Sequence, residues 1–238
     1  MQTENTPIFE QTENIPQKNI WKTSDTWIGL IILLILIAIF LGIALKFDLM
    51  NSDASSLLLS APQLLMMIPI AIIFLWRKVS WKELGFFPFK WQDLALGCGL
   101  LLFVYFLTII NNMLMMVLGV VTQAETIFEV LDEIESIPFF ILTSMFIAPI
   151  FEEIFFRGFL FRGFRQKYGW KIALFLSALI FSLFHGQVAT LIPTFLLGSL
   201  FAYMVQRTES ILPSMILHFL VNSVGTCGLL AAYQYGGI

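Results

Sequence analysis

The sequence predicts an all-α membrane protein, a polytopic bundle of about seven transmembrane helices with its N-terminus in the cytoplasm. Composition is the first observation behind this fold class: of 238 residues, 58% are hydrophobic and only 12% are charged. Soluble domains carry about a quarter charged residues, so a water-soluble enzyme is excluded. The 25 Phe and the long Leu and Ile runs exclude intrinsic disorder. A net charge of -3 without any basic run predicts no nucleic-acid partner.

Apolar runs long enough to cross about 30 Å of hydrocarbon are the second observation. They lie at 27–45, 57–76, 94–121, 138–160, 171–187, 188–206 and 211–233. The first run has no charge and no small-residue cleavage site after it, so we interpret it as a retained span rather than a signal peptide. The chain then divides into a polar cytoplasmic tail, 1–26, and a single membrane domain, 27–238. The polar motifs described below gather in a core at 138–233.

The distribution of basic residues is the third observation, because Lys and Arg concentrate in cytoplasmic loops. With the N-terminus inside, all 13 Lys and Arg except Lys46 fall in or beside cytoplasmic segments. The reversed topology would place the same residues outside. The sequence therefore predicts a cytoplasmic N-terminus and an outer C-terminus.

The loop at 122–137 differs from the others because it is acidic and amphipathic. Apolar residues recur there at spacings of three and four, with five acids between them and no basic residue. This pattern is typical of a helix that lies on the outer face of a bundle. Two interpretations stay open: a segment that only packs on the bundle, or a lid or dock for a basic peptide.

Ionisable residues inside apolar spans are the candidate functional groups, because placing them there costs about 2.5–3.5 kcal/mol each. The fourth span contains two adjacent acids, Glu152 and Glu153, followed by Arg157. Glu153 and Arg157 are four residues apart and can pair on one helix face. Glu152 points about 100° away. We therefore expect Glu153 to be neutralised by Arg157 while Glu152 faces an internal cavity.

The only two histidines of the chain also lie in or at the ends of apolar spans. His185 lies near the end of the fifth span. His218 lies in the seventh, and Asn222 follows it by four residues, so those two side chains share a helix face. Together with the two acids, these residues are the main strongly polar groups of the late spans. We expect them to form one cluster within the membrane.

Two kinds of hydrolytic site are compatible with this set. Without metal, Glu152 is the general base, and His185, His218 and Asn222 bind the water or the developing oxyanion. With zinc, Glu152, His185 and His218 are a ligand set that leaves one position open for water, and Glu153 is the base or an orienting group. No Gly-x-Ser-x-Gly, His-Glu-x-x-His or Gly-rich phosphate loop occurs in the sequence. No cofactor is certain, and zinc remains open.

These residues resemble the three signature motifs of the CPBP/Abi family, which includes CAAX prenyl proteases and bacteriocin-processing enzymes. The matching motifs are Glu152-Glu153-x-x-x-Arg157, Phe181-x-x-x-His185 and His218-x-x-x-Asn222. All three occur in order, on separate apolar spans, within about 148–225. The N-terminal half shares only its hydrophobic character.

The resemblance implies an α-helical intramembrane endopeptidase whose site opens toward the cytosol. By the motif match, Glu152 activates the water, while Glu153 and Arg157 shape the site. His185, His218 and Asn222 match its remaining polar residues. The implied location is the bacterial plasma membrane, and the implied substrates are secreted-peptide precursors or membrane proteins. A sensor kinase or a peptide exporter is an implied partner.

Two other functions are compatible with the same sequence. The first is a non-catalytic bacteriocin-immunity factor or membrane signalling regulator on the same fold. The intact polar set favours the enzyme over this alternative. The second is a proton- or ion-coupled transporter, which predicts internal symmetry, and the sequence contains no repeat.

Overall fold

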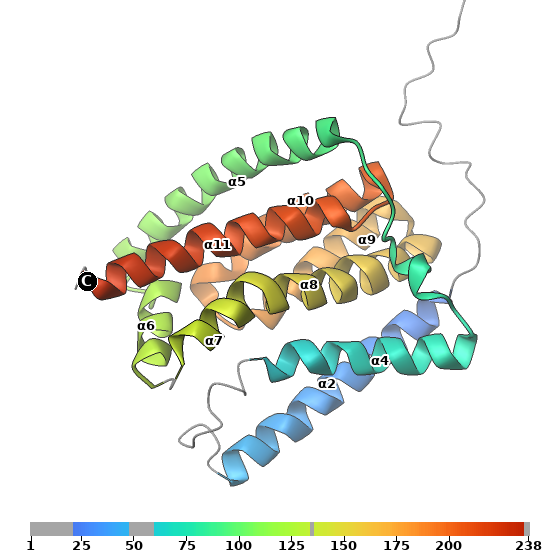
Figure 1. Ribbon diagram of the computed structural model, residues 1–238, viewed down its shortest axis with the longest axis horizontal. Coiled ribbons are helices and arrows are strands. Elements are labelled where there is room, and N and C mark those ends of the chain that lie inside the picture. The colour runs from blue at the N-terminus through green and yellow to red at the C-terminus, as the bar shows by residue number, and fades with distance from the viewer. Residues whose placement is uncertain (1–20, 48–59, 134–135, 236–238) are drawn as a thin grey trace, which may run out of the picture.

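The computed structural model describes residues 21–47, 60–133 and 136–235, and these residues form a bundle of helices (Figure 1). The longer helices are α2 (Thr23–Lys46), α4 (Ala61–Arg77), α5 (Trp91–Val117), α6 (Gln123–Glu133), α9 (Arg162–Phe184), α10 (Leu191–Thr208) and α11 (Leu212–Gln234). The shorter ones are η2 (Trp81–Leu84), α7 (Ile137–Leu142), η3 (Thr143–Ile147), α8 (Ala148–Glu152), η4 (Glu153–Phe161) and η5 (Val188–Thr190).

The predicted fold class is confirmed. Five helical stretches of the described residues are long and apolar enough to cross a membrane: Thr23–Lys46, Trp91–Val117, Ile137–Phe184, Val188–Thr208 and Leu212–Gln234. The shorter α4 is also apolar. The stretch Ile137–Phe184 has 48 residues, about twice the length of one span, so the bundle contains seven apolar helical segments.

The fourth and fifth predicted spans are the two halves of that long stretch. The chain changes direction at Gly169, whose φ of +74° and ψ of 167° are not helical. A residue without a Cβ adopts this positive φ at little cost, and other residue types do not. The turn folds α9 back against η4, and α9 also packs along α10. The two segments are therefore antiparallel neighbours, which brings the residues near the end of α9 toward the middle of the bundle.

Several predicted boundaries move by a few residues. Helix α2 begins at Thr23 instead of 27, so the end of the predicted tail belongs to the bundle. There Thr23 Oγ1 donates to the carbonyl of Gly163 at 2.8 Å, and buried Asp25 pairs with Arg77 at 2.7 Å. The third span ends at Val117 instead of 121, and the fifth ends at Phe184 instead of 187. Parts of four predicted segments lie outside the described residues, namely 1–20, 57–59, 134–135 and 236–238.

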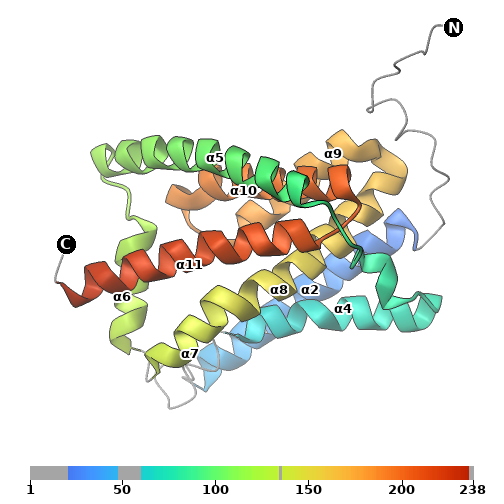
Figure 2. The same cartoon turned by 45° about the horizontal axis from the view of Figure 1, so that its top comes forward.

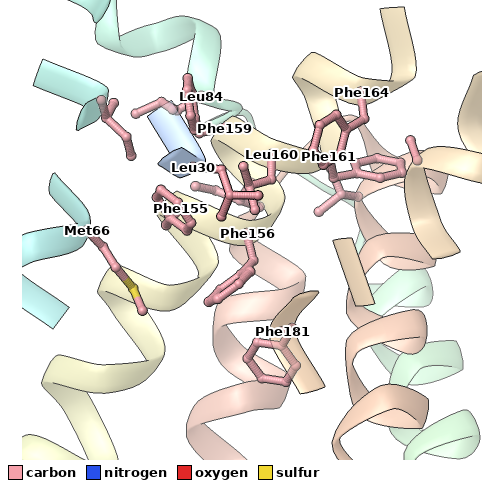
Figure 3. Packing of buried hydrophobic residues seen from close by; sticks show 14 of the residues in the cluster. Leu30, Met66, Leu84, Phe155, Phe156, Phe159, Leu160, Phe161, Phe164 and Phe181 are labelled. Atoms are coloured by element: carbon pink, nitrogen blue, oxygen red, sulfur yellow. The ribbon is translucent and has the colours of Figure 1, made fainter. Parts of the chain in front are cut away.

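The core of the bundle is built around η4, in which every residue except Ile154 is buried. Its phenylalanines, with Phe164 and Phe181 of α9, pack against Leu30 of α2 and Met66 of α4 (Figure 3). Because η4 is surrounded on all sides, its polar side chains cannot reach lipid or water. Each must find a partner inside the bundle.

Charged residues gather at one end of the bundle. Four ion pairs connect different segments of the bundle there: Asp25–Arg77, Asp93–Arg207, Arg162–Glu209 and Arg165–Glu209. The start of α2 lies at this end, and the end of α11 lies at the opposite end, as an odd number of crossings requires (Figures 1 and 2). The arrangement agrees with the predicted topology, in which this basic end is cytoplasmic. That the basic end of the bundle faces the cytoplasm stays a prediction.

The predicted amphipathic helix is present as α6 at the other end of the bundle, beside the end of α11 (Figure 2). Phe128 packs on Tyr233 with ring centroids 5.8 Å apart, and the Tyr233 hydroxyl donates to Asp132 at 2.6 Å. Helix α6 therefore rests on α11. Its role as a lid or a dock stays a prediction.

Candidate active site

The two adjacent acids lie where the helix changes its winding. Glu152 ends α8 and Glu153 begins η4, a nine-residue π-helix. A second π-helical stretch, η3, precedes Pro149 in α8. Proline has no N–H for the helical ladder, and π-turns occur frequently at functional sites. The hydrogen-bond register is thus altered on both sides of the acids.

Glu153 and Arg157 form the predicted ion pair. Their Oε1 and Nη1 atoms are 3.2 Å apart, and neither side chain has any exposed surface. Nη2 of Arg157 also donates to the carbonyl of Gly198 at 3.4 Å. The guanidinium lies 4.3 Å from the ring centroid of Phe181 and 5.2 Å from that of Phe201. An arginine over aromatic faces is favourable where water is excluded.

His218 connects the two acids. Its Nδ1 lies 3.0 Å from Oε1 of Glu153, and its Nε2 lies 3.7 Å from Oε2 of Glu152. A carboxylate that pairs with arginine can only accept hydrogen bonds, so Nδ1 carries the hydrogen that is directed at Glu153. The imidazole stacks on Phe201 at 5.0 Å, which restrains the ring. Nε2 is therefore held facing Glu152.

Glu152 is the more accessible of the two acids. Its side chain is 14% exposed, against 0% for Glu153. Its distance to His218 is longer than a hydrogen bond. The two neighbouring carboxylates thus differ in environment: Glu153 is enclosed by an arginine and a histidine, and Glu152 is partly exposed, 3.7 Å from Nε2 of that histidine.

His185 and Asn222 lie near this group without a direct contact to the acids among the described residues. Nδ1 of His185 faces the carbonyl of Phe181 at 2.9 Å, and its ring packs on Phe181 at 4.7 Å. His218 meets the same Phe181 ring at 5.8 Å. Asn222 lies one helical turn beyond His218, and its Nδ2 donates to the carbonyl of Ser144 at 2.8 Å. The structure therefore brings Glu152, Glu153, Arg157 and His218 together directly, and it places His185 and Asn222 at the border of this group.

The positions of the site residues can be compared with the metal-free and the zinc-dependent sites that the sequence allows. Within the described residues, no three His, Cys, Asp or Glu side chains are placed to hold a metal ion. Nδ1 of His218 is engaged with Glu153, and Nδ1 of His185 is engaged with a backbone carbonyl. Nε2 is therefore the remaining ring nitrogen of each histidine, as it is in histidines that ligate metal through Nε2, so the zinc set of Glu152, His185 and His218 stays a prediction.

The structure adds contributors to the site that the sequence prediction did not assign. The Phe181 ring lies among Arg157, His185 and His218, although the sequence pattern indicated only its spacing from His185. The carbonyls of Ser144 and Gly198 are backbone acceptors, which no residue pattern reveals. The only sequence feature that could have indicated the π-helical winding is Pro149, which lies three residues before Glu152.

Comparisons with known proteins agree with the motifs. Residues 134–224 match the family model of "Type II CAAX prenyl endopeptidase Rce1-like" proteins. The chain is also 30% identical over 107 residues to "Putative membrane peptidase YdiL" of Bacillus subtilis. That alignment covers 45% of this chain and 44% of the relative, so the chain spans under half the length of the relative that it matches. No solved structure matches the chain.

The matched region contains every polar residue of the candidate site, from Glu152 to Asn222. The apolar helices and the similarity to a bacterial membrane peptidase identify a multi-pass protein of the bacterial plasma membrane. Through the region 134–224, the chain is similar to CAAX-type membrane proteases of the CPBP family.

Proposed function

We propose that this chain is an intramembrane endopeptidase that hydrolyses peptide bonds of membrane-associated or secreted-peptide precursors. The observation that carries the proposal is the contrast between the two adjacent acids. Glu153 is fully enclosed by Arg157 and His218, whereas Glu152 is partly exposed and faces Nε2 of the same histidine. Two carboxylates in different environments can divide the roles of orienting group and base.

In the proposed reaction, the Glu152 carboxylate takes a proton from a water molecule, and the water oxygen attacks the carbonyl carbon of the peptide bond. The tetrahedral oxyanion accepts hydrogen bonds from polar groups at the border of the site, for which the Asn222 amide and the protonated ring of His185 are the candidates. When the C–N bond breaks, protonated Glu152 returns the proton to the leaving amine. No step passes through a metal.

Glu153, Arg157 and His218 have supporting roles in this proposal. Glu153 fixes the His218 tautomer, as a buried acid does when it orients a histidine. Arg157 keeps Glu153 ionised and therefore an acceptor. His218 then presents Nε2 to the water beside Glu152.

An apolar groove beside this group is the proposed approach for the substrate. It has a volume of 280 Å³. One wall is formed by η3 and α8 and the other by α11, and its lining residues include Pro149, Ile150, Met215 and Phe219. Pro149 and Met215 each precede a site residue, Glu152 and His218, by three positions. A substrate segment in this groove would come from the bilayer. A sensor kinase or a peptide exporter remains a predicted partner.

The test compares the membrane peptides of cells that produce the wild-type chain or Glu152→Gln at equal levels. We expect a set of peptide fragments to disappear in Glu152→Gln and their precursors to accumulate. Glu129→Gln on α6 is the matched control, because the same change there lies outside the site. Identical fragments from wild type and Glu152→Gln would contradict proteolysis and would favour the immunity or signalling alternative.

A further inference from the structure

A second cavity lies away from the candidate active site. It has a volume of 480 Å³ and is enclosed by α5, α10, α11 and the beginning of α6. None of the six candidate site residues lines it. Ligand pockets in proteins generally have volumes of about 300–1,000 Å³, so the space is large enough for a bound molecule.

The walls of this cavity offer little hydrogen bonding. Four threonines line it. Backbone carbonyls already accept from the hydroxyls of three of them: Thr108 donates to the Val104 carbonyl at 3.0 Å, Thr190 to the Gln187 carbonyl at 3.0 Å and Thr194 to the Thr190 carbonyl at 2.6 Å. The fourth, Thr122, lies at the mouth, and apart from Tyr105 and Asn112 the remaining lining of the cavity body is apolar. A cavity with such walls favours an apolar occupant over water.

The cavity is elongated along the helices. On α5 its lining runs from Val104 to Met116, which is about 18 Å of helix at 1.5 Å per residue. On α11 it runs from Val221 to Leu229. An alkyl chain that lies parallel to the membrane normal has this shape.

The mouth of the cavity is acidic. Thr122, Gln123 and Glu125 line it where α6 begins. The Glu125 carboxylate accepts from the Thr122 N–H at 2.6 Å and from the Thr122 hydroxyl at 2.9 Å, and these bonds lower the pKa of Glu125. Helix α6 adds Glu129 and Asp132 and contains no Lys or Arg. A cationic group is therefore favoured at the mouth, and a purely anionic one is repelled.

We propose that this cavity binds one acyl chain of a bilayer phospholipid whose headgroup carries an amine, with the amine beside Glu125. Phosphatidylethanolamine has this chemistry, whereas phosphatidylglycerol has the same chains without the amine. The site is separate from the peptidase site and does not depend on the proposed proteolysis. The lipid would hold α11, which carries His218 and Asn222, against α5 and α10.

Two glycines of α11 supply a matched pair of variants. A Cβ built on Gly225 or on Gly228 meets no atom within 4 Å, so either position accepts a larger side chain. Gly225 lines the cavity, and Gly228 does not. The aliphatic side chain in Gly225→Leu therefore occupies space in the cavity that the acyl chain would take. Gly228→Leu makes the same substitution outside the cavity.

The experiment uses the full chain in nanodiscs that contain phosphatidylethanolamine or phosphatidylglycerol with a photoactivatable diazirine in one acyl chain. Cross-linked peptides are quantified by mass spectrometry. We expect phosphatidylethanolamine to label the lining segments 104–116, 189–197 and 221–229 more than phosphatidylglycerol, by about fivefold, the scale of one exposed ion pair. Gly225→Leu should lose this labelling and Gly228→Leu should keep it. Glu125→Gln should abolish the preference between the two lipids.

Equal labelling of wild type and Gly225→Leu would overturn the proposal, because it would mean that only the annular lipid around the bundle is labelled. Equal labelling by the two lipids in wild type would overturn the assignment of the amine. If Gly225→Leu is not recovered as a monodisperse protein, Leu197→Trp, which fills the cavity from α10, replaces it.

Discussion

Glu153 accepts a hydrogen bond of 3.0 Å from Nδ1 of His218 across 65 positions of the sequence. The same carboxylate oxygen is 3.2 Å from Arg157. One buried acid thus holds a cation on its own helix and an imidazole on another helix. This relationship orients the second nitrogen of His218 toward Glu152, and it explains why the two adjacent acids are not equivalent.

Glu152→Gln should abolish peptide hydrolysis while leaving the fold intact, because the side chain keeps its size and loses only its basicity. Glu153→Gln should lower both activity and stability, because it removes the anion that pairs with Arg157. The measurement is cleavage by the purified chain of a precursor identified in cells, together with thermal unfolding in detergent. Equal activity of Glu152→Gln and wild type would contradict its role as the base.

Arg157→Ala should destabilise the chain by about 3–5 kcal/mol, because it leaves Glu153 charged and buried without its partner. The double variant Glu153→Ala with Arg157→Ala should be more stable than Arg157→Ala alone. Reversible unfolding of Glu153→Ala, Arg157→Ala and the double variant in mixed micelles measures this coupling. If the two single changes are simply additive in the double variant, the pair is not coupled as the structure indicates.

His218→Ala should reduce activity more than His185→Ala, because only His218 contacts the acids directly among the described residues. His218→Gln tests the same point with less change in volume. The comparison uses kcat and KM for one precursor in one detergent. A larger loss at His185 would show that the ring beside Phe181 has the more direct role.

Hydrolysis should persist after exhaustive chelation with EDTA and 1,10-phenanthroline, because in the proposed reaction Glu152 activates the water without a metal. Metal content of the purified chain, measured by mass spectrometry, accompanies the assay. Loss of activity on chelation that added Zn²⁺ restores would favour the zinc version of the site.

Gly163→Ala should destabilise the bundle by about 1–3 kcal/mol through overpacking. Its Cβ would lie 1.9 Å from Oγ1 of Thr26 and 2.6 Å from Nε1 of Trp21, two groups that are buried and bonded to each other. Gly228→Ala is the control and should be neutral or stabilising, because that position is open and helical. Thermal unfolding of both variants against wild type decides the point.

The helices, the Glu153–Arg157 pair and the turn near Gly169 follow from local sequence. Apolar runs of sufficient length must be helical in a bilayer, because every backbone polar group has to be bonded within its own segment. A spacing of four residues places Glu153 and Arg157 on one face wherever the helix lies. These features depend on neighbours in the chain, so the sequence alone determined them.

The partners that other helices supply to the two acids, and to His185 and Asn222, were decided by tertiary packing. The contact of His218 with Glu153, the Phe181 ring between the two histidines and the Ser144 carbonyl beside Asn222 join segments that are far apart in the chain. The separate cavity of 480 Å³ likewise arises where α5, α10, α11 and the beginning of α6 do not close fully on one another. Apolar spacing indicates that a helix face is buried but does not specify its partner, because hydrophobic burial has no direction. Only the tertiary structure supplies that information.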